Sequence, residues 1–209
     1  MDTHITFVLD SSGSMAEIKD DTVGGFNTFL REQVDEEGSA SVTLYDFNDE
    51  VNLVYQAQPI EEASELTDSS YSPGGRTALH DAIITAINSA ADRFDELETE
   101  ERPDNAIIVV LTDGKENASE TPQATVRDQV DYRQTEHEWE FFFIGANQDA
   151  TLTASKMGMK EDQALSMSHS GDGAQAAYDS TSEVISNSRK TGEVNGYSDE
   201  DRQRQRDAE

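Results

Sequence analysis

The chain has 209 residues and ordinary apolar content, which suffices for one compact domain, and its lack of cysteine excludes disulfides, zinc-thiolate sites and thiol nucleophiles. Its 44 acidic and 15 basic residues give a formal net charge of -29, which excludes electrostatic attraction to nucleic acids and anionic membranes. The longest apolar runs are far too short to cross a bilayer. We therefore expect a soluble, cytoplasmic protein that contacts neither nucleic acid nor membrane.

The acidic residues are spread along the whole sequence, and lysine is scarce. Such a surface repels itself in dilute buffer, whereas molar salt shortens the Debye length to about 3 Å and screens the repulsion. This composition resembles that of proteins from salt-loving, halophilic organisms. A merely acidic protein without that adaptation is the alternative.

The first half of the chain alternates between β-type and helical patterns. A buried strand is predicted over 5–9, and apolar residues then recur at helical spacing over 23–34. Two β-rich runs, 39–47 and 51–56, are separated by a short polar turn, which predicts an antiparallel hairpin. A long apolar stripe over 79–94 predicts a helix that faces the core.

The second half continues the alternation. The run 106–111 is apolar on both faces, as expected of a central parallel strand, and 139–144 is similar. A helix is predicted to begin at Pro122 between them, because proline is tolerated in a first helical turn. Three shorter elements complete the predicted domain: a helix over 150–157, a weak edge strand over 164–168 and an amphipathic helix over 174–185.

This succession predicts an α/β fold, a Rossmann-like three-layer sandwich with a mostly parallel six-stranded sheet, one antiparallel edge hairpin strand and helices on both faces. Apolar residues nearly vanish from Thr191 onward. We therefore predict one domain over 1–190 and a polar, disordered C-terminal tail over 191–209.

Oxygen-bearing side chains follow the most apolar strands. Asp10, Ser12 and Ser14 come at alternate positions after the first strand, Thr77 precedes a helix, and Asp113 follows a second strand. In open α/β sheets, ligands bind beyond the carboxyl ends of the strands, where the strand order reverses. If the two strands are adjacent, these side chains meet in one crevice and could close a site for a hard cation.

In this arrangement the chain resembles the von Willebrand factor type A (VWA) family, whose metal-ion-dependent adhesion site (MIDAS) has the pattern Asp-x-Ser-x-Ser, then a Thr, then an Asp. The resemblance covers about 3–188 and includes the segments Gly-Gly-Arg-Thr-Ala-Leu-His-Asp-Ala-Ile and Leu-Thr-Asp-Gly. It implies that Ser12 and Ser14 bind the metal ion directly. It also implies that Thr77, Asp10 and Asp113 bind the ion directly or through water.

The donor set suits Mg²⁺, which prefers oxygen ligands and is commonly held by only one or two carboxylates; Mn²⁺ or Ca²⁺ are alternatives. Three neutral hydroxyls, with two acids that can bind through water, leave much of the ion's positive charge uncancelled. In many members of the family, a Glu or Asp from a protein partner fills the remaining position. The predicted function is therefore a divalent-metal-dependent protein-binding module for adhesion or assembly, with the oligomeric state left open.

Simpler interpretations exist for several of these residues. Asp10, Ser12 and Ser14 could cap local turns, although capping leaves Thr77 and Asp113 unexplained. Four residues near the expected rim could contact a partner, but ordinary surface solvation explains them more economically: Arg76, His80, Lys115 and Glu116.

The alternative function is a magnesium-dependent phosphoryl-transfer or hydrolytic enzyme with Asp10 as nucleophile. Such an enzyme requires a second acid two residues after the nucleophile, but this position is Ser12. It also requires a cationic side chain near the phosphate, and Lys115 is the nearby lysine. The sequence has no Gly-x-Ser-x-Gly and no His-Glu-x-x-His pattern. We therefore do not expect an enzyme.

Overall fold

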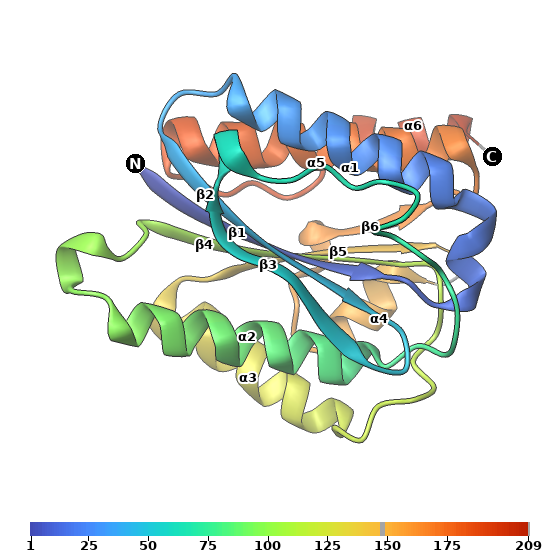
Figure 1. The fold of residues 1–209 in the computed structure, drawn as a ribbon, viewed down its shortest axis with the longest axis horizontal. Coiled ribbons are helices and arrows are strands. Elements are labelled where there is room, and N and C mark those ends of the chain that lie inside the picture. Colours follow the sequence, from blue (N-terminus) through green and yellow to red (C-terminus); the bar gives the residue numbers. More distant parts are fainter. Residues whose placement is uncertain (147–148, 209) are drawn as a thin grey trace.

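The computed structural model describes residues 1–146 and 149–208, and Figure 1 shows one twisted sheet between two layers of helices. The strands stand in the order β3-β2-β1-β4-β5-β6. Neighbouring strands are parallel except β2 and β3, which form the predicted antiparallel hairpin. The predicted fold class is confirmed. The strands are β1 (Asp2–Asp10), β2 (Ser39–Phe47), β3 (Val51–Pro59), β4 (Asn105–Thr112), β5 (Glu140–Ala146) and β6 (Ala164–Met167).

Helices cover both faces of the sheet. In Figure 1, α1, α5 and α6 lie on one side and α2, α3 and α4 on the other. The helices are α1 (Lys19–Val34), α2 (Leu79–Glu96), α3 (Gln123–His137), α4 (Ala150–Lys156), α5 (Gly171–Thr191) and α6 (Asp199–Asp207). Among the described residues, no helix is both long enough and apolar enough to span a bilayer.

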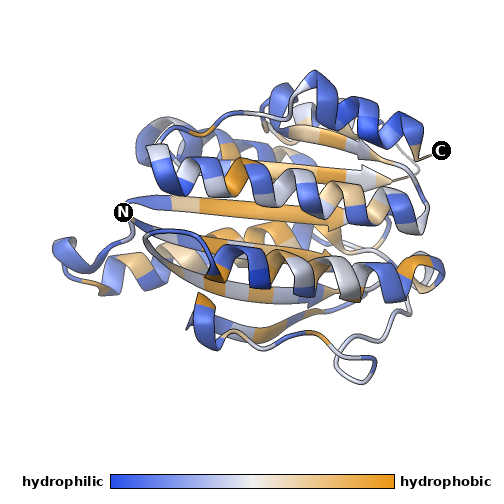
Figure 2. Ribbon diagram, turned by 90° about the horizontal axis from the view of Figure 1, so that it is seen from above, coloured by the Kyte–Doolittle hydropathy of each residue, from blue (hydrophilic) through white to orange (hydrophobic). Residues whose placement is uncertain are grey.

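The central strand β1 is buried on both faces and divides the core in two. Side chains at alternate positions of a strand point to opposite faces, so Phe7 belongs to the cluster beneath α1 and α5 while Val8 belongs to the cluster beneath α2. Phe7 packs edge to face against Phe26 and Phe29, with ring centroids 5.2 and 4.8 Å apart. Figure 2 shows the hydrophobic residues concentrated along the strands and the more hydrophilic surfaces on the covering helices.

The strand order places the ends of β1 and β4 side by side. β1 pairs with β2 on one side and with β4 on the other, with Leu9 opposite Leu111. The order therefore reverses between β1 and β4, and the residues that follow them, Asp10 and Asp113, emerge at the same edge of the sheet. This adjacency is the condition that the predicted site required.

The structure differs from the predicted disordered tail, because the described residues beyond Thr191 fold back onto the domain. Tyr197 is buried, and its ring packs edge to face against Phe142 at 5.6 Å. Ser198 and Asp201 form a capping box that begins α6. One buried aromatic and a well-capped helix thus order a segment whose composition indicated disorder.

The strand β3 forms one free edge of the sheet, and its pairing with β2 is irregular. The register shifts between Val42 and Leu44 and again between Leu44 and Tyr45. Ala57 has a positive φ of 46°, and its N–H donates to the side-chain oxygen of Thr43 at 2.9 Å. Two large apolar side chains on this strand are exposed: Leu53 and Val54.

Candidate metal centre

Asp10 ends β1 at the bottom of the candidate site and is fully buried. Its Oδ1 accepts a 2.6 Å hydrogen bond from the N–H of Ser12, its Oδ2 accepts from the Thr112 hydroxyl, and its carbonyl accepts from the Tyr71 hydroxyl. Burial raises the pKa of the Asp10 carboxyl, the hydrogen bonds from Thr112 and Ser12 oppose that rise, and the nearby charge of Asp113 adds to it. A cation beside Asp10 would favour its ionised form.

The two serines of the first loop connect Asp10 to Asp113. The Oγ atoms of Ser12 and Ser14 lie 3.3 Å apart, and Ser14 Oγ donates to Asp113 Oδ1 at 2.5 Å. Asp113 directly follows β4, so its carboxylate reaches a loop that is 99 residues distant in sequence. Four of the five predicted ligands therefore lie in one hydrogen-bonded group: Asp10, Ser12, Ser14 and Asp113.

Thr77 reaches this group from the loop before α2. A methyl group added to Gly114 would lie 2.7 Å from Thr77 Oγ1 and 3.5 Å from Asp10 Oδ2, so the Thr77 hydroxyl and the Asp10 carboxylate both approach the backbone there. Only glycine allows this approach. The main chain of Thr77 is fixed by Asn117, whose Oδ1 accepts from Thr77 N at 3.0 Å and whose N–H donates to Thr77 O at 3.1 Å.

Backbone hydrogen bonds hold the loops before α1 and α2 together. The N–H of Gly13 donates to Gly75 O at 3.1 Å, and the N–H of Gly74 donates to Ser11 O at 2.8 Å. Gly75 has a φ of 81°, in the left-handed region that favours glycine. Gly74 and Gly75 thus place Thr77 against the loop that carries Ser12 and Ser14. The structure brings all five predicted ligands together.

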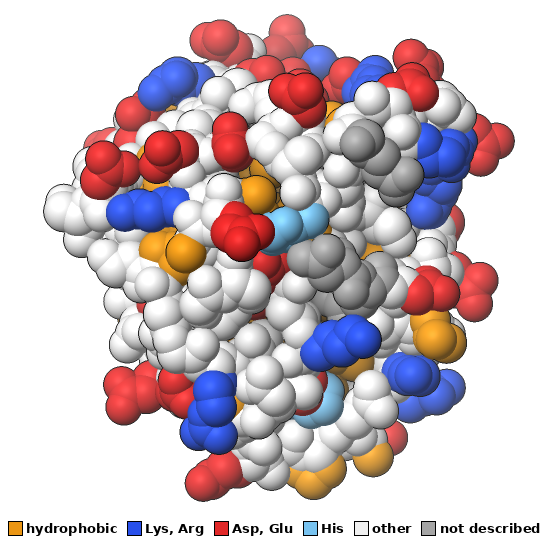
Figure 3. Space-filling view, turned by 90° about the vertical axis from the view of Figure 1, so that its right-hand side faces the viewer, with side chains coloured by type: hydrophobic (Ala, Val, Ile, Leu, Met, Phe, Trp, Pro, Cys, Tyr) orange, Lys and Arg blue, Asp and Glu red, His pale blue; other side chains and the backbone are white. Residues whose placement is uncertain are grey.

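Above Asp10 lies an open hollow of about 480 Å³, lined by Ser12, Ser14, Thr77 and Asp113 among others. Figure 3 shows the face of the molecule that carries this hollow. It is the side on which the parallel strands end in Figure 1. Histidine and acidic side chains lie near its centre, and hydrophobic side chains are few. A ligand from solvent therefore has access to the hydroxyl and carboxylate oxygens.

The donor set fits a hard cation. All five side chains offer oxygen, and three of them are neutral hydroxyls, which suits Mg²⁺, Mn²⁺ or Ca²⁺. Among the described residues, no cluster of three or more His, Cys, Asp or Glu side chains could hold a metal ion. A cation in this hollow would therefore depend on the hydroxyls and on water or an outside ligand in addition to the two acids.

His169 belongs to the site although the sequence pattern did not indicate it. Its Nε2 lies 2.9 Å from Asp113 Oδ2, and its Nδ1 lies 3.8 Å from a carboxylate oxygen of Glu17. The one available signal is its position just after the edge strand β6, because the parallel strands all end on this side of the sheet. The contact spans 56 residues, so no local spacing pattern reveals it.

The four predicted rim residues divide into two pairs. Arg76 and Lys115 line the hollow, and Arg76 is paired with Asp49 at 2.7 Å. Glu116 instead accepts from the backbone N–H groups of His80, Ala118 and Ser119, and the His80 ring lies 3.2 Å from the Thr121 carbonyl oxygen. Glu116 and His80 thus hold the loop after β4 against the start of α2.

The von Willebrand factor type A domain model matches residues 4–181 of the chain, which is most of its length. The chain belongs to the VWA family. VWA domains are commonly adhesion or protein-interaction modules with divalent-metal MIDAS sites. No curated protein sequence is significantly similar to this chain.

Solved structures share the VWA fold at low sequence identity. Proximal thread matrix protein 1 from the mussel byssus, with a zinc-occupied MIDAS motif, has a TM-score of 0.62 and 15% identity over 88% of this chain and 46% of its own. The vWF domain of the type V pili tip protein Mfa5 from Porphyromonas gingivalis has a TM-score of 0.65 and 11% identity, covering 92% and 97%. The pilus adhesin SpaC from Lactobacillus rhamnosus GG has a TM-score of 0.65 and 13% identity, covering 88% and 30%.

At these low identities, the structural likeness shows the fold alone. This chain spans less than half the length of the mussel protein that it matches. The five oxygen-bearing residues and the hollow above them are properties of this chain, and they carry the functional argument that follows.

Proposed function

We propose that the protein is a divalent-metal-dependent protein-binding module whose cation accepts a Glu or Asp side chain from a partner. The observation that supports it is the convergence of five oxygen-bearing residues from three loops on one open hollow: Asp10, Ser12, Ser14, Thr77 and Asp113. We assign these five residues as the ligands, directly or through water, and Mg²⁺ as the ion.

Charge balance favours an acidic partner. A bound divalent cation would supply a positive centre that binds carboxylate oxygen. Asp10 is buried and already accepts hydrogen bonds through both carboxylate oxygens, and Asp113 shares its oxygens with Ser14 and His169. Because both acids are buried, the solvent side of such an ion is left to water or to an outside carboxylate, which would complete the set.

Adhesion or assembly is the class of role that the family supports. One structural relative carries zinc in its MIDAS motif and another is a pilus adhesin, and both share the fold of this chain. The net charge of -29 further leads us to propose that the module works in a salt-rich environment, where long-range repulsion between acidic proteins is screened.

The test is recovery of partners from a lysate of the source cells with Mg²⁺ or with EDTA, together with calorimetric titration of the purified protein with Mn²⁺. Thr77→Val removes one hydroxyl at nearly constant shape, and Thr135→Val on the exposed side of α3 is the matched control. We expect magnesium-dependent recovery and Mn²⁺ binding that Thr77→Val weakens and Thr135→Val leaves unchanged. Equal recovery with Mg²⁺ and EDTA contradicts the proposal.

We also propose that the chain is not an enzyme. Both carboxylate oxygens of Asp10 are engaged by Ser12 and Thr112, which disfavours a role as nucleophile. A screen of the purified protein with phosphate and acyl esters in Mg²⁺ tests this. Turnover that disappears in Asp10→Asn would support the enzymatic alternative.

A further inference from the structure

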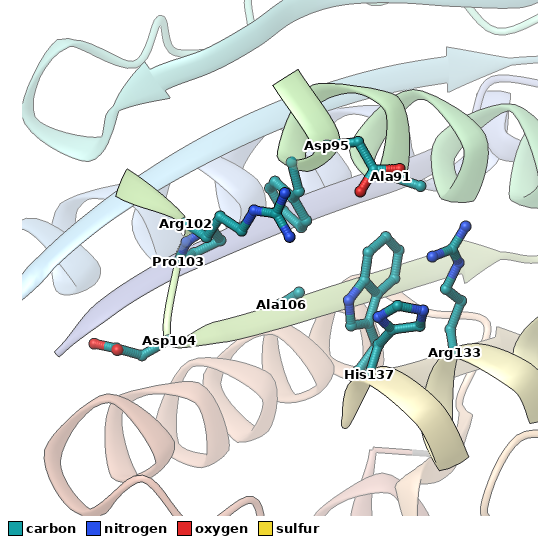
Figure 4. A pocket seen from close by; sticks show the side chains of 10 residues that line it. Ala91, Asp95, Arg102, Pro103, Asp104, Ala106, Arg133 and His137 are labelled. Atoms are coloured by element: carbon teal, nitrogen blue, oxygen red, sulfur yellow. The ribbon is translucent and has the colours of Figure 1, made fainter. Parts of the chain in front are cut away.

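A second hollow lies at the opposite end of the sheet from the metal centre. It has a volume of about 180 Å³ and opens between the last turns of α2 and α3 and the segment that leads into β4 (Figure 4). Its apolar walls come from Ala91, Phe94, Ala106 and Trp139, and its basic groups come from Arg102, Arg133 and His137. We call it the β4-entry cavity.

Arg133 is the unusual member of the β4-entry cavity. Its guanidinium carbon lies 5.0 Å from the ring centroid of Trp139, and its Nε is buried without a hydrogen-bond partner. Within the part of the chain that the structure describes, no carboxylate lies within 4.0 Å of this guanidinium. Although acidic residues outnumber Lys and Arg by 44 to 15, this half-buried guanidinium contacts the rings of Trp139 and Tyr132 and no carboxylate, so its charge is available to an anion.

A second guanidinium enters from the other side. Arg102 extends over the cavity in Figure 4, and its Nε donates to the carbonyl oxygen of Leu97 at 3.3 Å. Its terminal amino groups form no hydrogen bond or ion pair with the described residues and remain available to a ligand. The two arginines approach the cavity from different elements, one from the segment before β4 and one from α3.

The acidic residues at the rim do not neutralise this pair. The carboxylate of Asp104 points away from the cavity in Figure 4 and accepts a 2.8 Å hydrogen bond from the N–H of Asp2. Asp95 is exposed on the α2 side, and neither Arg102 nor Arg133 forms an ion pair with it in the described structure. The cavity therefore combines apolar walls with two guanidinium groups that pair with neither of its two aspartates.

We propose that the β4-entry cavity binds a small organic carboxylate with a ring or another compact apolar body. The planar guanidinium of arginine matches a carboxylate through two parallel hydrogen bonds, and the aromatic and alanine walls suit the apolar part. A cavity of about 150 Å³ is known to hold a benzene ring, so a volume of about 180 Å³ suits a ligand of roughly one substituted ring. A ligand with a single negative charge is also repelled less than a phosphate by a protein of net charge -29.

This site is independent of the metal centre, because it lies where β4 begins and the metal ligands follow where β4 ends. Ligand binding at this site can also be followed by tryptophan fluorescence. Trp139 lines the cavity and is the one tryptophan of the sequence, so intrinsic fluorescence excited at the red edge of the tryptophan band reports on this site alone.

The experiment titrates the full chain with cyclohexanecarboxylate, which does not absorb in the tryptophan band, and with the neutral cyclohexanecarboxamide of nearly the same shape. We expect a saturable change in Trp139 fluorescence with the carboxylate and at least about tenfold weaker binding of the amide. No saturable change up to the solubility limit, or equal binding of both compounds, overturns the proposal. Inorganic phosphate and acetate complete the series: tighter binding of either than of the ring carboxylate also overturns it.

Variants identify the cations involved. Arg133→Gln and Arg102→Gln should each weaken carboxylate binding by about tenfold. Arg127→Gln is the matched control, because Arg127 lies on α3 as well but is exposed and pairs with Asp131 at 3.6 Å. Saturation-transfer NMR on the ligand provides a readout that does not depend on the tryptophan environment. Wild-type affinity in both Arg133→Gln and Arg102→Gln contradicts the assignment, and Arg102→Gln keeps the test valid if Arg133→Gln does not fold.

Discussion

His169 Nε2 lies 2.9 Å from Asp113 Oδ2, which ties the segment between β6 and α5 to the loop after β4. The residues on either side of His169 are held in turn by the C-terminal helix. Gln205 Oε1 accepts from Ser168 N at 3.0 Å, and the hydroxyls of Ser168 and Ser170 donate to the carbonyl oxygen of Ala208 at 3.2 and 3.0 Å. The helix α6 therefore braces a residue that contacts a proposed metal ligand.

Removing the imidazole should weaken metal binding. His169→Ala leaves Asp113 Oδ2 without this partner, and loss of such a supporting contact typically costs about tenfold in metal affinity. His169→Gln, whose amide nitrogen can reach a similar position, should retain most of the affinity. Calorimetry with Mn²⁺ measures both, and His137→Ala at the far end of the molecule is the control. Equal affinity in His169→Ala and wild type would show that Asp113 is positioned without His169.

Two adjacent glycines of α1 should respond oppositely to alanine. A methyl group on Gly24 meets nothing within 4 Å, so Gly24→Ala should stabilise the fold by up to about 1 kcal/mol through helix propensity. A methyl group on Gly25 would lie 2.2 Å from the ring of Tyr178 on α5, so Gly25→Ala should destabilise by about 1–3 kcal/mol. Urea unfolding of the two variants checks the sign. A stabilising Gly25→Ala would mean that α5 moves away at little cost.

The buried aromatic of the C-terminal segment should contribute to stability. Tyr197 is 5% exposed, and its hydroxyl lies 2.9 Å from Thr181 Oγ1 on α5. Tyr197→Ala leaves a large cavity and should lower the free energy of unfolding by about 3 kcal/mol. Gln203→Ala on the exposed side of α6 is the control. If unfolding of Tyr197→Ala matches wild type, the segment behaves in solution as the disordered tail that composition indicated.

His4 should make the fold sensitive to mild acid. Burial lowers the pKa of His4 to about 4, with a further contribution from Arg93, whereas the unfolded value is 6.5. Below about pH 6.5, His4 binds a proton in the unfolded chain but not in the folded chain, so the free energy of unfolding falls as the pH falls. Below about pH 4 both states are protonated at His4, and this group causes no further change. The total loss is about 3 kcal/mol.

His4→Gln isolates this contribution, because glutamine can keep polar contact with Ser41 and Thr43, the two partners of the ring. Comparing urea unfolding at about pH 7.5 and about pH 4.5, wild type should lose about 2–3 kcal/mol more than His4→Gln. A constant difference between the two proteins at both pH values would mean that His4 titrates normally in the folded state.

Salt should strengthen the proposed contact with an acidic partner. A carboxylate approaching a protein of net charge -29 is repelled at long range, and salt screens that repulsion more than it screens direct metal coordination. Affinity for a Glu-containing partner or peptide should therefore rise between low and molar KCl, as measured by calorimetry in Mg²⁺. A steady fall over this range, with the fold intact by circular dichroism, would contradict the expectation.

The sheet and the five converging residues were accessible from the sequence because their signals are local. Strands such as 106–111 are short runs apolar on both faces, and the Asp-x-Ser-x-Ser pattern lies within one turn. From the sequence, the pairing of β1 with β4 was only a condition; the structure shows it, and it explains why Asp10 and Asp113 meet. Thr77 was identified as a ligand from the family resemblance. A hydroxyl just before a helix would otherwise be interpreted as an ordinary N-cap.

The features that were missed depend on contacts between distant, mostly polar residues. The segment 192–208 has few apolar residues, and Arg202 helps to hold it by donating to the carbonyl oxygen of Ala164 at 2.8 Å, a bond that no hydropathy pattern predicts. The contact between His169 and Asp113 and the β4-entry cavity likewise arise only when three elements pack together. Periodicity identifies elements, whereas the side-chain partners between elements require their arrangement in space.

The irregular pairing of β3 bears on how copies of this protein stay apart. A regular outer strand offers its unused amide and carbonyl groups to a neighbouring molecule, and the exposed Leu53 and Val54 would add to that attraction. Once concentrated electrolyte removes the mutual repulsion of the acidic surfaces, charge no longer prevents such stacking. The shifted register and the turned backbone at Ala57 then provide a steric safeguard against fibre-like growth.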